Sequence, residues 1–317
     1  MNIVLLDAQT LGQTPENDSL DSISKLGNFK SYKITKPNEV IDRAKDADIV
    51  LTNKVVLDKT ILEKLPKLKL ICITATGMNN IDLEYAKKLN IEVKNVANYS
   101  TQSVAQHTLM MVLNLIAKQN YYDDFAKSGK WAQSAIFTHI DSNFELYDLE
   151  NKNWSIIGFG NIGQRVAKLA SAFDANVKYY STSGKNTNTD FKRIENLQDL
   201  LKNSDIITIH APLNETTKNL ITKKELALLK KDSILINVGR GGIVNENDVA
   251  SALKNSDFYY GCDVLECEPM IKNHPFLDSS IQHKLLLSPH IAWAYKESRK
   301  RLIEGAEKNI KDFLNKY

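Results

Sequence analysis

The chain has 317 residues, enough for two domains of about 150 residues, each with its own core. Its 41 basic and 38 acidic residues are nearly balanced and form no basic stripe, so we expect no nucleic-acid partner. The opening residues predict a strand and not a signal peptide, and no apolar run approaches the roughly 20 residues that span a bilayer. Three cysteines without metal-ligand spacing are expected to be reduced. These features predict a cytoplasmic α/β protein that needs neither a metal nor a membrane.

The first hundred residues alternate apolar strands with helical stretches, which is typical of a parallel sheet covered on both faces. The predicted strands are Ile3–Asp7, Lys30–Ile34, Asp48–Thr52, Leu68–Thr74 and Glu92–Val96. The loop after the first strand, Ala8–Asn17, has no phosphate-binding glycine pattern. We therefore expect this half to be an α/β domain other than the nucleotide-binding one.

The pattern changes after Val96. Ser100-Thr101-Gln102 supplies N-cap chemistry for a long helix from about Ser103 to Asn120, which we interpret as the link to the second domain. Residues Tyr121–Asn153 contain several aromatic side chains but show no periodicity. They predict an irregular arm whose aromatic residues serve either a homodimer interface or local packing.

A glycine-rich turn organises the second half. Trp154–Ile157 reads as a buried strand, and Ile162 and Val166 begin a helical pattern after it. Between them lie the three glycines of a GxGxxG turn: Gly158, Gly160 and Gly163. In such a turn the glycines permit a tight bend, the approach of a pyrophosphate and close helix packing. The helix start at Asn161 and Ile162 offers N–H groups to the anion, so the segment predicts a dinucleotide-binding domain.

Strands and helices continue to alternate after this turn. Further strands are predicted at Val177–Ser181, Ile206–His210, Ile234–Val238, Tyr260–Val264 and Leu285–Ser288, with helices near Leu197–Lys202, Lys223–Leu229 and Glu246–Leu253. A last helix, from about Tyr295 to Leu314, could return to the first domain. We therefore expect a discontinuous substrate domain of residues 1–99 plus 295–317, and a dinucleotide-binding domain of residues 100–294.

Three of the later strands are followed by residues that could carry chemistry: Arg240, Glu268 and His290. Ligands of open parallel sheets bind at the carboxyl ends of the strands. An arginine can bind a carboxylate in a bidentate manner, a histidine can transfer a proton, and a carboxylate can orient that histidine. Each residue alone is more often structural or simply exposed. Together they predict a hydride-transfer site for a 2-oxo acid.

The chain resembles the D-isomer-specific 2-hydroxyacid dehydrogenases along essentially its whole length. The matching motifs are Ala75–Asp82, Ser103–Thr108, Gly158–Gly163, His210–Thr217, Gly239–Gly242, Asp263–Pro269 and Ser288–Trp293. The glycerate dehydrogenase, or hydroxypyruvate reductase, branch is the most similar. The resemblance implies two Rossmann-like or flavodoxin-like domains with parallel sheets and a cleft between them. It also implies reversible reduction of a small 2-oxo acid, of the hydroxypyruvate or glyoxylate type, to the D-2-hydroxy acid with NAD(P)H.

The resemblance further implies a role for each matching residue. His290 would protonate the keto oxygen as hydride arrives, Glu268 would orient His290, and Arg240 would bind the carboxylate. Glu266 is interpreted as an exposed neighbour without a role. The backbone of three residues would also bind the carboxylate: Ala75, Thr76 and Gly77. The side-chain pocket is assigned to Met78, Asn98 and Trp293. Further cofactor contacts would come from His210, Ala211, Pro212, Thr217, Val238, Gly239, Asp263 and Ala292, with Asp263 at the nicotinamide carboxamide.

The strand after the glycine turn departs from the NAD pattern. It ends at Ser181, where an acid normally binds the ribose 2′-hydroxyl of NAD. Without that acid, Ser181, Thr182 and Lys185 could bind the 2′-phosphate of NADP. Alternatively, Asn186 or a backbone group serves the ribose of NAD, since no arginine is present there. The sequence thus leaves NAD and NADP open.

Two other functions fit the same resemblance. One is a phosphoglycerate dehydrogenase of serine synthesis, a branch that often carries a C-terminal regulatory domain. The other is a non-catalytic NAD(H)-sensing protein similar to transcriptional corepressors, for which long disordered tails are expected. The last predicted helix lies within a few residues of Tyr317, so we favour the small-acid dehydrogenase.

Overall fold

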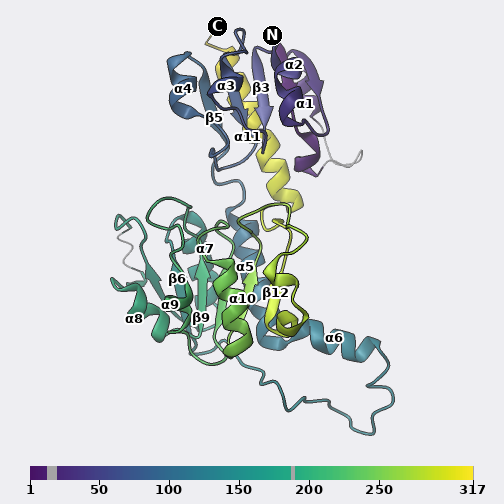
Figure 1. Cartoon of the computed structure of the whole chain (residues 1–317), viewed down its shortest axis with the longest axis vertical. Coiled ribbons are helices and arrows are strands. Elements are labelled where there is room, and N and C mark those ends of the chain that lie inside the picture. Colours follow the sequence, from purple (N-terminus) through teal and green to yellow (C-terminus); the bar gives the residue numbers. More distant parts are fainter. Residues whose placement is uncertain (13–19, 187–189, 317) are drawn as a thin grey trace. The chain divides into compact units, whose positions relative to one another are not determined.

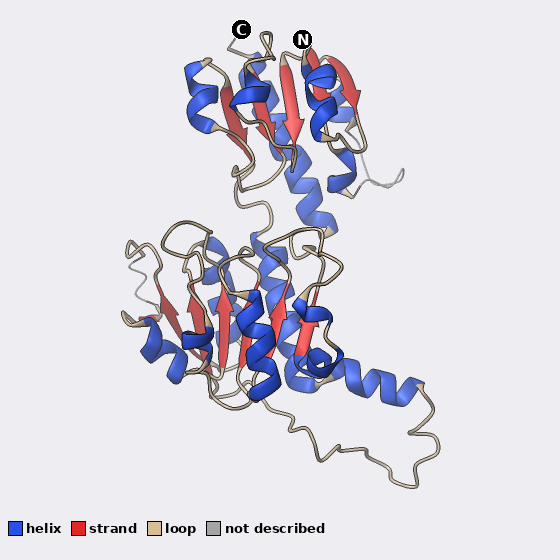
Figure 2. Cartoon of the chain, viewed as in Figure 1, coloured by secondary structure: helices blue, strands red, loops and turns tan. Residues whose placement is uncertain are grey.

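The computed structural model describes residues 1–12, 20–186 and 190–316. The chain divides into two compact units, residues 1–100 with 293–317 and residues 101–292. Each unit is built on a parallel sheet with helices around it, which confirms the predicted α/β class (Figures 1 and 2). Residues 13–17 of the loop predicted to lack a phosphate-binding pattern lie outside the described residues.

The sheet of the first unit has the strand order β2-β1-β3-β4-β5, which is the flavodoxin-like order. Its strands are β1 (Asn2–Leu5), β2 (Asn28–Ser31), β3 (Ile49–Thr52), β4 (Leu70–Ile73) and β5 (Glu92–Asn95). Its helices are α1 (Asp21–Ser24), α2 (Val40–Ala44), α3 (Lys59–Leu62), α4 (Leu83–Lys88) and α11 (Lys296–Leu314), with short 3-10 turns at Ala8–Leu11 and Pro37–Glu39. Side chains of β3 point alternately to two cores: Ile49 and Leu51 pack with α11, and Val50 packs on the opposite face.

The sheet of the second unit has the order β12-β11-β10-β9-β6-β7-β8, a Rossmann order that reverses between β6 and β9. Its strands are β6 (Asn153–Ile157), β7 (Asn176–Tyr180), β8 (Lys192–Arg193), β9 (Ile206–Ile209), β10 (Ile234–Asn237), β11 (Tyr259–Cys262) and β12 (Leu285–Leu287). Its helices are α5 (Thr101–Ala117), α6 (Gln119–Lys127), α7 (Asn161–Ser171), α8 (Leu197–Lys202), α9 (Lys223–Leu226) and α10 (Glu246–Asn255), with 3-10 turns at Pro275–Leu277 and Ser279–Lys284. The two-residue edge strand β8 has no counterpart in the prediction.

The long helix predicted from Ser103 to Asn120 is wrong at its end, because the structure breaks it at Lys118. This residue has a left-handed backbone, with φ 51°, between α5 and α6. Its buried ammonium donates a hydrogen bond of 2.8 Å to the carbonyl of Leu115 and lies 3.1 Å from the centre of the Tyr259 ring. These contacts compensate for a conformation that a residue other than glycine rarely adopts. Among the described helices, none is long and apolar enough to cross a membrane.

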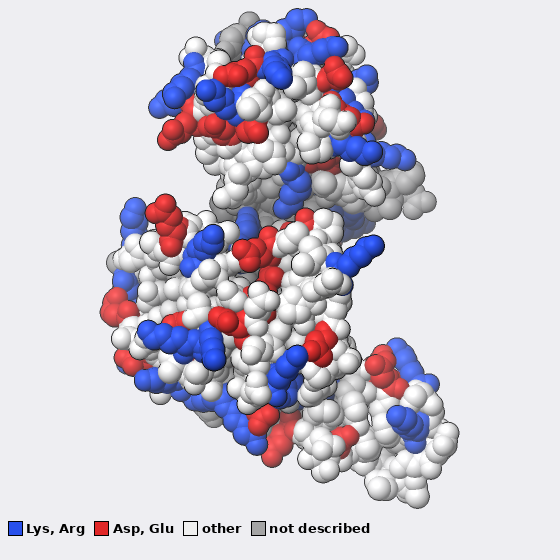
Figure 3. Space-filling view, in the orientation of Figure 1, with Lys and Arg blue, Asp and Glu red and all other residues white. Residues whose placement is uncertain are grey.

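An arm, comprising α6 and residues 128–148, extends away from the second sheet (Figure 1). Its first part is helical, which corrects the expectation of an irregular segment. Some of its aromatic rings pack within the arm: Phe125 stacks on His139 with 3.8 Å between ring centres. Others are exposed, among them Phe137 at 91%. In Figure 3 the visible face of the arm carries only scattered charges.

Candidate active site

The glycine turn joins β6 to α7, and each glycine has its own steric reason. Gly158 has φ +88°, and a Cβ there would lie 2.6 Å from the amide nitrogen of Ala211. A Cβ on Gly163 would lie 2.3 Å from the carbonyl oxygen of Gly158, whereas a Cβ on Gly160 would meet nothing within 4 Å. Gly160 is also the N-cap of α7 and provides no side-chain cap. The positive end of α7 therefore opens onto space beside Gly160, which fits a dinucleotide pyrophosphate.

The loop after β7 holds the residues predicted near the ribose 2′ position. Ser181 is buried, and its hydroxyl accepts a hydrogen bond of 3.4 Å from the amide of Asn186, while Lys185 is exposed. Arg193 of β8 donates to the carbonyls of Gly184, at 3.0 Å, and Asn186, at 3.2 Å. Its buried Nε has no partner among the described residues. The segment itself contains no arginine, but the structure brings Arg193 of the neighbouring strand to this loop.

Arg193 could not be identified from the sequence because it lies beyond the loop, on a strand that is too short to show a periodic pattern. The signal that could have found it is the pairing of β7 with β8, which places Arg193 opposite Tyr179. In a parallel sheet the residue at the end of the neighbouring strand lies beside the same ligand edge.

The turn after β9 contains a histidine that the protein leaves unsatisfied. Both ring nitrogens of His210 are buried and have no hydrogen-bond partner among the described residues. Burial lowers the pKa of His210 to about 3, so its ring is neutral at physiological pH. Such a ring at the carboxyl edge of the sheet suits contact with a bound ligand. The Thr217 hydroxyl instead donates to the carbonyl of Pro212, at 2.6 Å, and braces the turn.

The arginine turn after β10 is held in shape by Asn237. The Asn237 side chain accepts from the amide of Gly239, at 3.1 Å, and donates to the carbonyl of Arg240, at 2.9 Å. A Cβ on Gly241 would lie 2.0 Å from the carbonyl carbon and oxygen of Leu265. The turn that carries Arg240 is thus pressed against the loop that leads to Glu268.

The side chains of His290 and Glu268 are hydrogen-bonded, with 2.6 Å between His290 Nδ1 and Glu268 Oε2. The other carboxylate oxygen of Glu268 accepts from the amide of Leu265, at 2.9 Å. The Glu268 carboxylate therefore fixes the His290 imidazole through Nδ1. The other ring nitrogen of His290, Nε2, has no partner among the described residues. Glu266 is exposed, and its amide donates to Glu246, at 2.7 Å.

Asp263 anchors the backbone that carries His290. It is 2% exposed. Its carboxylate accepts hydrogen bonds from the amides of Ile291, at 2.8 Å, and Ala292, at 2.9 Å, and from the hydroxyl of Ser288, at 2.6 Å. Its carbonyl accepts from the amide of His290, at 2.8 Å. Both carboxylate oxygens are thus already engaged within the protein. Two further predicted cofactor residues, Val238 and Ala292, are buried at the same edge.

The residues predicted to bind the substrate carboxylate belong to the first unit. Ala75, Thr76 and Gly77 follow β4 at its carboxyl end. The Thr76 hydroxyl donates to the carbonyl of Val96, at 3.1 Å, and its own carbonyl accepts from Asn95, at 2.6 Å. The predicted wall residues lie in the same unit: Met78 packs on the core, Asn98 has φ +64°, and Trp293 meets Tyr99 edge-on.

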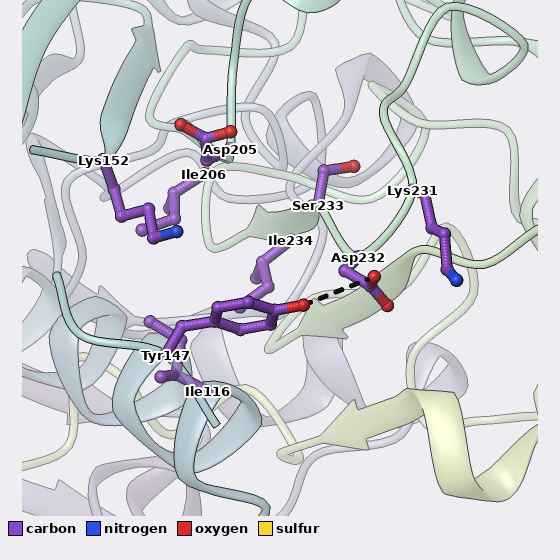
Figure 4. A pocket seen from close by; sticks show the side chains of 9 residues that line it. All are labelled: Ile116, Tyr147, Lys152, Asp205, Ile206, Lys231, Asp232, Ser233 and Ile234. Carbon is purple, nitrogen blue, oxygen red and sulfur yellow. Dashed lines mark hydrogen bonds between the residues drawn. The ribbon is translucent and has the colours of Figure 1, made fainter. Parts of the chain in front are cut away.

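A separate cavity of about 120 Å³ lies at the opposite, amino edge of the second sheet (Figure 4). It is lined by Ile116, Tyr147, Lys152, Asp205, Ile206, Lys231, Asp232, Ser233 and Ile234. There the hydroxyl of Tyr147, at the end of the arm, donates to Asp232 at 3.4 Å. This cavity is where the arm returns to the sheet, and it contains none of the predicted site residues.

A Rossmann sheet with a dinucleotide turn and a histidine–carboxylate pair at the same edge defines a nicotinamide-dependent oxidoreductase. Residues 109–292 match the family model described as D-isomer specific 2-hydroxyacid dehydrogenase, NAD binding domain. The chain is 34% identical to a hydroxypyruvate reductase of Blautia hydrogenotrophica over 99% of its own length and 97% of that protein's. It belongs to the D-isomer-specific 2-hydroxyacid dehydrogenase family.

Solved structures agree with this assignment. An acyclic imino acid reductase in complex with NADPH and D-Arg matches with a TM-score of 0.87 and 28% identity, covering 100% of this chain and 98% of that one. A D-lactate dehydrogenase of Aquifex aeolicus complexed with NAD and lactic acid matches with a TM-score of 0.82 and 27% identity, covering 99% and 96%. These relatives bind different nicotinamide cofactors.

Proposed function

We propose that the chain reduces a small 2-oxo acid, with hydroxypyruvate as the first candidate and glyoxylate as the second, to the D-2-hydroxy acid. The observation that carries the proposal is the 2.6 Å contact between His290 and Glu268 at the carboxyl edge of the nucleotide-binding sheet. The similarity to a hydroxypyruvate reductase over nearly the whole chain supports the choice of substrate. The alternatives are a phosphoglycerate dehydrogenase and a non-catalytic sensor.

In the proposed reaction some residues transfer the proton and others stabilise the charge of the substrate. Reduction of a ketone adds hydride to carbon and a proton to oxygen, and the bound nicotinamide supplies the hydride. His290 gives the proton from Nε2 to the keto oxygen, while Glu268 holds Nδ1–H and stabilises the imidazolium. Arg240 binds the carboxylate and draws charge toward the carbonyl. In the reverse direction neutral His290 accepts the proton.

In this proposal the compact unit of residues 101–292 serves as the dinucleotide-binding domain, and the unit of residues 1–100 with 293–317 serves as the substrate domain. The dinucleotide is held by Gly158, Gly160, Asn161, Ile162, Gly163, His210, Ala211, Pro212, Val238, Gly239 and Ala292. Backbone groups of Ala75–Gly77 bind the substrate carboxylate.

The loop after β7 should accommodate NADPH at least as well as NADH. Ser181 stands where an acid would repel a 2′-phosphate. Lys185 is exposed on this loop, and the guanidinium of Arg193, which pairs with Glu195 at 2.9 Å, lies on the neighbouring strand and would have to exchange that partner for the phosphate. A lysine and an arginine beside two hydroxyl residues, Ser181 and Thr182, form a suitable receptor for a phosphate dianion.

The arm favours a homodimer. Ile136, Phe137 and Ile140 are 67%, 91% and 74% exposed, which is a large apolar surface for an isolated arm. A second copy of the chain, with its own arm, would bury these side chains in a two-fold arrangement. A reducing compartment such as the cytoplasm suits the three free cysteine thiols, of which only Cys267 is exposed.

The proposal is tested with purified protein, NADH and NADPH against hydroxypyruvate, glyoxylate and pyruvate. We expect turnover with at least one acid, and His290→Gln should lower kcat by about 10³-fold while the cofactor Kd changes little. His283→Gln makes the same change at an exposed histidine of the same unit and should leave kcat unchanged. Near-normal turnover by His290→Gln would remove the acid–base assignment, and cofactor binding without turnover would favour the sensor.

A further inference from the structure

A chain of hydrogen bonds leads from a buried histidine on α5 to the segment that carries His290. His107 Nε2 lies 2.9 Å from the hydroxyl of Ser288, and that hydroxyl lies 2.6 Å from Asp263 Oδ1. His107 is 2% exposed. It reaches this position because α5 passes over β11 at Gly261, where a Cβ would lie 3.2 Å from Met111.

The short distance between Ser288 and Asp263 fixes the direction of the protons. Two oxygens 2.6 Å apart repel each other unless a proton lies between them, so the Ser288 hydroxyl donates to Asp263. The same hydroxyl must then accept from His107, whose Nε2 therefore carries a hydrogen. Burial lowers the pKa of His107, although the nearby Asp263 opposes the shift, so the ring is neutral near pH 7. Its tautomer is Nε2–H.

Asp263 connects these hydrogen bonds to the backbone of the segment that carries His290. Its oxygen Oδ1 accepts both from Ser288 and from the amide of Ile291, and Oδ2 accepts from the amide of Ala292. His290 has φ +55°, a left-handed conformation that costs about 1–2 kcal/mol for a residue other than glycine. Such a backbone persists only where its surroundings over-determine it.

We infer that His107 and Ser288 are positioning residues that hold Asp263, and through it the His290 backbone, in the geometry needed for proton transfer. The inference rests on the proposed function of His290. Neither residue touches substrate or cofactor in this scheme. A purely apolar side chain at position 107 would fill the same space but would leave Ser288 free to turn away from Asp263.

The catalytic test compares His107→Leu with His107→Gln, whose amide N–H₂ can replace the Nε2–H donor. We expect His107→Leu to lower kcat about 10- to 100-fold with little change in cofactor Kd, and His107→Gln to recover most of the loss. Thr108→Val is the matched control, because that buried hydroxyl donates a hydrogen bond within α5, to the carbonyl of Val104. In the double variant with Ser288→Ala, kcat should fall no further than with Ser288→Ala alone. The inference would be overturned if kcat fell equally in both His107 variants. It would also be overturned if the fold-loss of kcat in the double variant equalled the product of the two single losses.

A second measurement is independent of turnover. Ring ¹⁵N chemical shifts of His107 should report the neutral Nε2–H tautomer at pH 7, and the amides of Ile291 and Ala292 should exchange faster with solvent in His107→Leu than in Thr108→Val. The Nδ1–H tautomer, or unchanged exchange of those amides, refutes the positioning role even if the enzyme is active. Failure of every 2-oxo acid with these signatures present would refute the proposed function and leave the relay intact.

Discussion

Replacement of Gly241 by alanine should separate the arginine turn from the loop that leads to Glu268. A Cβ at this position would lie 2.0 Å from the carbonyl of Leu265 and 2.3 Å from the amide of Glu266, whereas ordinary contacts begin at 3.4 Å. The neighbours are backbone atoms and cannot rotate away. The two segments must therefore move apart by about 1.4 Å, the difference between 2.0 and 3.4 Å.

A displacement of this size should affect rate more than folding. Misplacement of reacting groups by about 1 Å can reduce a rate about 10²-fold, while overpacking typically costs about 1–3 kcal/mol of stability. We expect Gly241→Ala to lower kcat with hydroxypyruvate about 10²-fold, and the cofactor Kd to change less, because the glycine turn after β6 is remote in sequence and on another strand.

Gly242→Ala is the control, because it strains the backbone without a clash. Gly242 has φ +79°, which costs an L residue about 1–2 kcal/mol, but the nearest atoms to its Cβ lie at 3.8 Å. Steady-state kinetics and thermal unfolding of both variants should give similar losses of stability and a large loss of kcat only in Gly241→Ala. The reasoning fails if Gly241→Ala keeps wild-type kcat, or if Gly242→Ala loses as much.

Three further predictions follow from separate parts of the chain. Lys185→Ala and Arg193→Met should each lower kcat/KM for NADPH about 10-fold or more relative to NADH, and a strong NADH preference of the wild type would refute the phosphate site. Phe137→Asp should shift the protein from dimer to monomer in sedimentation, unlike Ile34→Asp at another exposed apolar residue, and a monomeric wild type would remove the arm interface. Burial lowers the pKa of Lys118 to about 8 from 10.5, so between these pH values the unfolded chain binds more protons at this lysine. The free energy of unfolding of the wild type, relative to Lys118→Met, should therefore rise from pH 8 to 10.5, and a flat difference in urea titrations would contradict this.

The strands could be predicted where burial makes their pattern strong. β3 and β4 are buried at every position, and each contains at least three consecutive apolar residues in the sequence. β2 is an edge strand with mostly exposed residues, and its predicted span, Lys30–Ile34, lies two to three residues beyond the observed Asn28–Ser31. The pairing of β11 with β12 brings the segments after them together, and so Glu268 meets His290.

Features held by tertiary contacts left no local signal. The break at Lys118 lies in a run without glycine or proline, and its left-handed backbone depends on the ring of Tyr259, far away in sequence. Arg193 belongs to a two-residue strand, which no periodicity can reveal. The role proposed for His107 is equally hidden. A histidine in an amphipathic helix can be recognised as a positioning residue only when its partner, here Ser288, is known.

Both restraints on His290 come from one short segment. Asp263 fixes its backbone, Glu268 fixes its ring, and Leu265 lies between them. The Arg240 turn presses on that segment at Leu265, through Gly241. A shift of this one loop therefore moves His290, the proposed proton donor, together with Glu268, relative to Arg240, the proposed carboxylate-binding residue. The distances between Arg240, Glu268 and His290 therefore depend on the backbone contact between Gly241 and Leu265. That contact is possible only because Gly241 has no Cβ.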